Sequence, residues 1–444
     1  MIYLKSYGLK KLFKEKQPMA TSILPTPLNF IKFFIQKFHG FTRLQRWVLT
    51  GLILSLFFTH KRASVASLAK QAGFSYNDAR YFLVRSKWQS LDQLNHGRLD
   101  TICAQKGTAP KKGGVNVFDD TGCPKRYAQK MEGVAWQYCG LTKETENCLV
   151  AFLVAYADQD KHFPIYCHPY HPAEDFKLGE SDPSFKSKIE LAMDAIKALA
   201  ADPRFPTCDV ADSWYAATKI IELEDSLGRT FISELKSNRC FLFQRPDTKQ
   251  AEYIAQDELV KLVRQYYRHK LKPLTRTNKD GKTRRIWFFE FPTKLKNCKV
   301  PIKAVLVLGR LFEEDKEDCA RILFATKLAM SGKEIVKTYD LRWGVEVCFR
   351  QLKDTFYFDH FQLHTLPHIE RYWFLVLMAW TIAYCCKQMG ILVKVVQIAG
   401  DTIAAHAEAI RNLIQFTSGR KMSKNNVDLE HYGIISQRAE ARAA

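Results

Sequence analysis

A change of hydrophobic period at Gly113–Gly114 limits the fold of this chain more than any other feature of its sequence. Before it, from about Phe30 to Leu99, apolar residues recur at helical spacing. After it, short apolar runs bounded by turn residues alternate with helical stretches. The expected order is strand, strand, strand, helix, strand, helix and strand, at Val115–Asp119, Cys148–Tyr156, Phe163–His168, Lys186–Ala200, Cys208–Ala211, Ala216–Leu227 and Thr230–Leu235. We therefore expect an α/β core preceded by an all-α part.

This order is the pattern of a ribonuclease-H-like core, in which three antiparallel strands precede alternating helices and strands. The first and fourth strands are neighbours in such a sheet, so acids at their ends lie side by side. Asp120 follows the first of the expected strands and Asp212 follows the fourth. Chemistry at this edge would need one further acid on a later helix.

The length of 444 residues exceeds what one hydrophobic core usually supports, so we expect several domains. Residues 237–326 contain alternating runs such as RRIWFFEF and VPIKAVLVLG, which predict a β-rich insertion in the core. The expected parts are a basic arm, with disorder as one alternative (1–29), a helical DNA-binding domain with a helix-turn-helix-like segment (30–110), the first part of the core (111–236), the insertion (237–326), the second part of the core (327–390) and a helical segment with a polar tail (391–444).

The charge balance indicates a polyanionic partner. Lysine and arginine total 67 against 46 acidic residues, which gives a formal net charge of +21. Nucleic acid is the usual partner of such a chain, although a basic protein without one is the simpler alternative. The 12 cysteines form no CxxC pair, which favours reduced thiols in a cytosolic compartment. The apolar runs Trp47–Phe58 and Trp373–Cys386 are too short to span a membrane, so buried helices are expected.

The segment SVASLAKQAGFSYNDARYFL has the spacing of a helix-turn-helix. Ala69 is small where two helices would approach, and Gly73 follows four residues later at the turn. Ser75 is expected to cap the second helix and to leave Asn77 and Arg80 on an exposed face that contacts DNA. An ordinary helical hairpin is the alternative.

One later segment, GKEIVKTYDLRWGVEVCFRQLK, is expected to be a single helix, because Gly344 is the only helix breaker after its first residue. On a helical wheel Tyr339, Arg342, Glu346 and Lys353 fall on one stripe, and a separate apolar face can pack on the sheet. The stripe would aim one carboxylate, with cations and a phenol beside it, at the edge of the sheet. Periodicity alone leaves open a surface ion pair between Glu346 and Arg350, four residues later.

The spacing Y-x2-R-x3-E-x6-K, with Trp343 directly after the arginine, resembles the YREK signature of insertion-sequence DDE transposases of the insertion sequence four group. The segments VFDDTGCPK and VADSWYAATK resemble the first-aspartate and second-aspartate segments of these enzymes, and similarity extends from about Phe41 to about Gly390. The resemblance implies cut-and-paste DNA transposition at terminal inverted repeats, strand transfer into target DNA and a homodimer in the synaptic complex. A DNA-binding descendant without catalysis and a metal nuclease of the same fold are the alternatives.

By this resemblance Asp120, Asp212 and Glu346 are the catalytic metal ligands. The family pattern places the first ligand directly before a threonine, which selects Asp120 over the adjacent Asp119. The DSWY context likewise selects Asp212 over Asp209. Carboxylates suit two Mg²⁺ ions, for which Mn²⁺ is a substitute.

The remaining residues of the signature are expected to contact DNA. The resemblance implies that Tyr339, Arg342 and Lys353 hold phosphates near the transposon end. Trp343 would stack on a DNA base that has left the double helix near the cleavage point, and Trp287 in the insertion is a weaker candidate for the same role. Packing in the core is the alternative for each tryptophan.

Overall fold

The computed structural model describes residues 40–59, 62–140, 142–277, 283–309, 320–392, 398 and 400–417. The expected basic arm and the polar tail after residue 417 lie outside the described residues. The chain divides into two compact units, which we call the helical unit and the sheet unit. The helical unit is made of residues 1–109, 123–149 and 348–444, and the sheet unit of residues 110–122 and 150–347.

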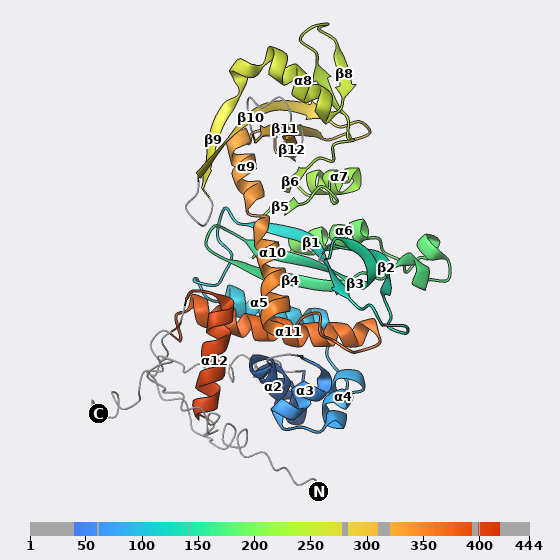
Figure 1. Cartoon of the computed structure of the whole chain (residues 1–444), viewed down its shortest axis with the longest axis vertical. Coiled ribbons are helices and arrows are strands. Elements are labelled where there is room, and N and C mark those ends of the chain that lie inside the picture. The colour runs from blue at the N-terminus through green and yellow to red at the C-terminus, as the bar shows by residue number, and fades with distance from the viewer. Residues whose placement is uncertain are drawn as a thin grey trace, which may run out of the picture. The chain divides into compact units, whose positions relative to one another are not determined.

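The helical unit is built around one long buried helix, α11 (Leu366–Gln388), which packs against α2, α4, α5 and α12 (Figure 1). Trp373 and Trp380 of this helix are almost fully buried. The predicted apolar runs thus lie in buried helices, and no helix in the described part of the chain meets the length and apolarity needed to cross a membrane. The other elements of the unit are α2 (Arg43–Phe58), α3 (Val65–Ala72), α4 (Tyr76–Val84), α5 (Leu91–Cys103), α12 (Ile403–Thr417) and β2 (Val134–Cys139), which pairs with the first residues of β3.

The pair α3 and α4 has the local structure that the helix-turn-helix spacing predicts. Gly73 ends α3 with φ of 75°, a conformation that costs a residue without Cβ very little. The Ser75 side chain accepts a hydrogen bond from the backbone N–H of Asp78 at 3.1 Å, so Ser75 caps α4 as expected. Asn77 and Arg80 are both exposed on α4.

The sheet unit contains a mixed sheet with the strand order β4-β3-β1-β5-β6-β12-β11-β10-β9. Strand β1 pairs in parallel with β5, and β5 pairs in parallel with β6, whereas β12 is antiparallel to β6. The first and fourth predicted strands are therefore neighbours, which is consistent with a ribonuclease-H-like core. The strands are β1 (Val115–Pro124), β3 (Glu144–Ala157), β4 (His162–Pro169), β5 (Cys208–Ala211), β6 (Thr230–Glu234), β9 (Lys272–Thr277), β10 (Thr283–Lys294), β11 (Pro301–Leu308) and β12 (Ala320–Ala325).

Helices and short turns complete the sheet unit. The predicted helices at 186–200 and 216–227 are present with small shifts of their ends. These two helices are α6 (Lys188–Ala201) and α7 (Thr218–Ser226). The sheet unit also contains α8 (Gln256–Tyr266), α9 (Gly332–Asp340) and the single turns η2 (Ala173–Asp175), η3 (Gly179–Ser181) and η4 (Arg268–Lys270). A separate hairpin pairs β7 (Phe241–Gln244) with β8 (Ala251–Ile254).

Residues 237–326 are rich in strands, and β9 to β12 extend the same sheet through the pairing of β12 with β6. A stretch rich in lysine and arginine, LVRQYYRHKLKPL, begins inside a helix that the strand pattern did not indicate, α8. Its apolar residues Leu259, Val260, Leu262 and Val263 are buried, so the start of the stretch is held by an amphipathic helix.

The expectation of one continuous helix over residues 332–353 is wrong. Helix α9 ends at Asp340, α10 (Trp343–Arg350) follows, and a π-helical turn, η6 (Gln351–Thr355), comes next. Backbone bonds such as Gly344 N–H to Leu341 O and Val345 N–H to Arg342 O span three residues instead of four. A Cβ at Gly344 would lie 2.7 Å from the Cβ of Ala157, so this close approach to β3 accompanies the break.

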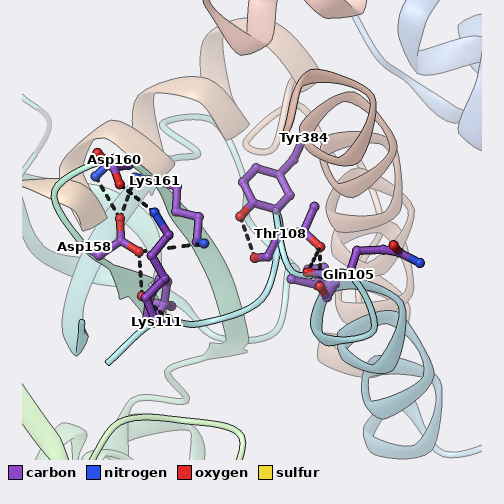
Figure 2. A network of polar contacts seen from close by, with 9 residues as sticks. Gln105, Thr108, Lys111, Asp158, Asp160, Lys161 and Tyr384 are labelled. Atoms are coloured by element: carbon purple, nitrogen blue, oxygen red, sulfur yellow. Dashed lines mark hydrogen bonds and ion pairs between the residues drawn. The ribbon is translucent and has the colours of Figure 1, made fainter. Parts of the chain in front are cut away.

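The turn that joins β3 to β4 is fixed by polar contacts (Figure 2). The Asp158 carboxylate accepts backbone N–H bonds from Asp160 and Lys161, each at 2.8 Å, and accepts the Tyr156 hydroxyl at 2.6 Å. Lys111 Nζ lies 2.6 Å from Asp160 and ties the segment before β1 to the same turn. In the helical unit, the Tyr384 hydroxyl donates to the carbonyl of Thr108 at 2.9 Å.

Candidate active site

Strand β1 presents its two adjacent acids to opposite sides. Asp120 Oδ2 lies 3.1 Å from Lys188 Nζ and 3.2 Å from the hydroxyl of Tyr215. The ring of Phe118, two residues earlier on the same face, packs against the Tyr215 ring. Asp119 points the other way and accepts a hydrogen bond from Arg342 Nη1 at 3.1 Å.

Strand β5 carries the second acid at its end. The Asp212 carboxylate accepts the backbone N–H of Trp214 at 2.9 Å, and the Asp212 carbonyl accepts the Ser233 hydroxyl at 2.8 Å. Burial raises the pKa of the Asp212 carboxyl, and the negative charge of Asp120 adds to that rise. Both contacts fix the turn that follows β5, so the acid is held in place by backbone.

The competing acid of β5, Asp209, belongs to a buried ion pair. Its carboxylate lies 2.6 Å from the guanidinium of Arg229 and accepts the side-chain amide of Asn116 at 2.7 Å. Glu224 completes this cluster 3.5 Å from Arg229. The side chain of Asp209 is fully buried, so it is closed to a substrate.

The third acid, Glu346, lies on α10 and is joined to β1 by a single arginine. Arg342 Nη2 lies 2.7 Å from Glu346 Oε1, while Nη1 of the same guanidinium donates to Asp119. The fork geometry of a guanidinium suits two carboxylates at once. Arg342 therefore bridges the strand acid and the helix acid.

Burial, with repulsion between neighbouring acids, raises the pKa of two of the carboxyls, Asp119 and Asp212. Burial raises the pKa of Asp119 to about 8, the charges of Asp212 and Asp120 add to the rise, and Arg342 opposes it. A divalent cation would relieve the same repulsion, and carboxylate oxygens are the ligands that Mg²⁺ prefers. Within the described residues, however, no three acidic, histidine or cysteine side chains are already arranged around one ion position. The donor chemistry fits such an ion, and Arg342 occupies the contacts that the ion would need.

The other residues of the signature are divided between the two units. In the sheet unit, Tyr339 is only 7% exposed and its hydroxyl donates to Glu234 at 3.3 Å, while Trp343 is 49% exposed at the start of α10. Trp287 is half-buried on β10. Lys353 lies in the helical unit, where it is buried in η6. The structure thus brings Asp119, Asp120, Asp212, Arg342 and Glu346 together in the sheet unit.

The predicted DNA-contacting residues of α4 lie in the helical unit as well. Arg80 lines a cavity of about 410 Å³ together with Tyr76, His364 and His368. Tyr76 is 51% exposed at the start of α4. This face of α4 is thus open and carries one cation, Arg80.

Sequence reasoning missed three residues that line the acid cluster: Lys188, Tyr215 and Trp214. Lys188 is the first residue of α6, directly after the capping residue Ser187, and only the fold brings it to Asp120. Tyr215 and Trp214 follow Asp212 in the DSWY segment, so their closeness in sequence was a signal that could have identified them.

Comparison with known families adds two overlapping matches. Residues 36–283 match the family described as DDE superfamily endonuclease, and residues 189–382 match the family described as transposase DDE domain. The first range includes Asp120 and Asp212, and the second includes Asp212 and Glu346.

Comparison with individual proteins adds little. No curated protein sequence matches the chain. Among solved structures, a chain of the piggyBac transposase synaptic complex with hairpin DNA is 11% identical, with a TM-score of 0.42, and the match covers 96% of this chain and 80% of that one. The family assignment rests on the first family match, which covers more than half of the sequence. The chain belongs to the DDE superfamily endonucleases.

Proposed function

We propose that this protein is a DNA transposase that cuts the terminal inverted repeats of an insertion sequence and joins the freed 3′-hydroxyls to target DNA. The observation that carries the proposal is the convergence of acids from β1, β5 and α10 beside Arg342. Three carboxylates from separate elements of one sheet unit suit metal-dependent phosphodiester chemistry. Membership in the DDE endonuclease family supports the same reading.

In this proposal, Asp212, Glu346 and one acid of the pair Asp119 and Asp120 hold two Mg²⁺ ions, with Mn²⁺ as a substitute. When bound, such ions make the attacking water or 3′-hydroxyl more acidic and neutralise charge on the leaving oxygen. The sequence pattern selects Asp120 as the first ligand. The contacts of Arg342 favour Asp119, because this acid faces Glu346 through the shared guanidinium, whereas Asp120 is paired with Lys188.

The basic and aromatic residues of the chain would hold the DNA. The Arg342 guanidinium can bind a phosphate with two N–H groups once it leaves the carboxylates. Tyr339 and Lys353 would also hold phosphates near the transposon end, in a synaptic complex of two copies of the chain. Trp343 is exposed and available to stack on a base, with Trp287 as a weaker candidate. Asn77 and Arg80 on the open face of α4 would contact the inverted repeats, and the net charge of +21 favours a polyanionic partner.

The test uses the full chain with labelled duplexes that carry the two DNA segments flanking its gene, in Mg²⁺ and in Mn²⁺. We expect nicking at the segment ends and joining of those ends to a plasmid, with both reactions lost in Asp212→Asn and Glu346→Gln. Asp225→Asn, at an exposed acid on α7, is the matched control and should react like the wild type. Binding without cleavage in either metal would instead indicate a DNA-binding protein, and cleavage without joining would indicate a nuclease.

A further inference from the structure

The exposed indole of Trp214 stands directly beside the acid cluster and has no role in the function proposed above. Its side chain is 54% exposed, which leaves a large apolar ring in water. Its backbone N–H donates to the carboxylate of Asp212 at 2.9 Å. The backbone that carries the ring is therefore held against an acid of the candidate active site.

Two lysines from different elements lie over this ring. Lys236 Nζ, just after β6, is 4.3 Å from the ring centroid, and Lys188 Nζ, at the start of α6, is 6.0 Å from it. The first distance is well within the range of cation–π attraction and the second is at its limit, and the Lys188 ammonium also lies 5.4 Å from the ring centroid of Tyr170. Lys188 also pairs with Asp120 at 3.1 Å, so the aromatic surface continues into the acid cluster.

A lysine that packs on an exposed tryptophan is often only a weak surface interaction. Here the arrangement differs in two respects. The ring keeps half of its surface open although two cations approach it, and one of these cations, Lys188, also contacts Asp120 in the acid cluster. An aromatic face with ammonium groups at its rim matches a nucleotide, whose base offers a flat π surface and whose phosphate offers negative charge.

We infer that Trp214, Lys236 and Lys188 form a nucleotide platform, on which an unpaired base of the DNA beside the cleaved phosphate stacks. The inference rests on the proposed function, since it identifies where one nucleotide of the substrate binds. Lys236 is exposed and binds the phosphate next to the stacked base. Lys188 positions the platform, because its ammonium is shared between the ring and Asp120. This platform is separate from Trp343 on α10.

The experiment uses the full chain with Ca²⁺ in place of Mg²⁺, so that DNA binds without being cut. A series of duplexes carries the fluorescent base 2-aminopurine at successive positions around the cleavage point. We expect one position at which the wild type changes the fluorescence through stacking. Trp214→Ala should abolish that change and weaken binding about tenfold, which is within the range for loss of one base stack. Trp214→Phe should restore most of both.

The matched control is Trp136→Ala, because Trp136 is 72% exposed on β2 in the helical unit. This variant should keep the wild-type fluorescence change and affinity. Lys236→Ala should lower the slope of log affinity against log salt by about one while the fluorescence change persists. Equal thermal midpoints of the variants and the wild type would exclude unfolding as the cause.

A Trp214→Ala protein with the wild-type fluorescence change and affinity would overturn the platform. That result is distinguishable from failure of the proposed function, in which the wild type itself neither binds nor cleaves the flanking DNA. Loss of the fluorescence change in both Trp214→Ala and Trp214→Phe, with folding intact, would also count against stacking, since phenylalanine retains an aromatic face.

Discussion

Arg342 lies 3.1 Å from the carboxylate of Asp119, although 223 positions separate the two residues in the sequence. The same guanidinium reaches Glu346 at 2.7 Å, so one cation links the acid of β1 to the acid of α10. A divalent ion bound by these two acids would compete with Arg342 for their oxygens. Metal binding and release of Arg342 are therefore expected to be linked.

Removal of this arginine should strengthen metal binding in the absence of DNA. Arg342→Ala takes away both a competing ligand and a positive charge, so we expect Mn²⁺ to bind about tenfold more tightly, equivalent to roughly 1.4 kcal/mol. Isothermal titration calorimetry of the DNA-free protein measures this directly. DNA cleavage should fall at the same time, because the variant has no guanidinium at this position to contact a phosphate.

Arg321→Ala is the control for this titration. Arg321 lies on β12, 3.8 Å from Glu234, and is half-exposed. Its loss should leave Mn²⁺ affinity close to that of the wild type. Weaker Mn²⁺ binding by the Arg342 variant than by the Arg321 variant would contradict the competition.

The adjacent acids of β1 should differ in their response to amide substitution. Asp119→Asn should abolish cleavage and weaken Mn²⁺ binding, because Asp119 faces Glu346 through Arg342 and is in the field of Asp212. Asp120→Asn removes the partner of Lys188 and should slow cleavage by about 10- to 100-fold, as is usual for residues that orient a metal ligand. Cleavage rates and Mn²⁺ titrations of the two variants decide between them. The reverse pattern would restore Asp120 as the first ligand, as the sequence pattern has it.

The stability of the metal-free protein should depend on pH through Asp119. Its carboxyl has a pKa of about 8 in the folded chain against an ordinary value of 3.8, chiefly because it is buried. Between these values the folded state holds a proton that the unfolded state has released, so the free energy of unfolding falls as pH rises through this window. The raised pKa of Asp212 acts in the same direction.

Urea unfolding in EDTA between pH 5 and pH 9 measures this dependence. We expect the wild-type midpoint to fall with rising pH and the midpoint of Asp119→Asn to fall less steeply. Addition of Mn²⁺ should raise the wild-type midpoint at pH 8 or above, since the ion binds only the folded, ionised site. Parallel curves for the two proteins would show that Asp119 titrates normally.

Much of the sheet could be predicted because its strands are short apolar runs between turn residues. Strand β5 was predicted with its observed bounds, and the sheet places β1 next to it. Strand β2, by contrast, was not indicated, because the segment VAWQYC is mostly half-exposed and gives no continuous apolar run. Local patterns thus identified strands that contain a run of buried residues, such as β4 and β5.

The contacts of the candidate site depended on tertiary structure. The wheel placed Arg342 and Glu346 on one stripe, and they do form a contact across one turn. The wheel could not show that Gly344 packs against Ala157 and that the helix is interrupted just before it, between Asp340 and Trp343. Nor could it bring Lys188, at the start of another helix, to Asp120. Pairing between distant elements leaves no period in the sequence.

The buried ion pair of Asp209 and Arg229 provides the last prediction, which concerns stability alone. Both side chains are nearly inaccessible, and Glu224 shares the guanidinium. Arg229→Met would leave two buried acids without a cation, which costs about 3–5 kcal/mol in the free energy of unfolding. Arg204→Ala is the control, because its pair with Asp202 is local in sequence and partly exposed, and should cost less than about 1 kcal/mol. Urea unfolding at pH 7 compares the two variants, and equal losses would show that burial does not raise the cost of breaking the Asp209 pair.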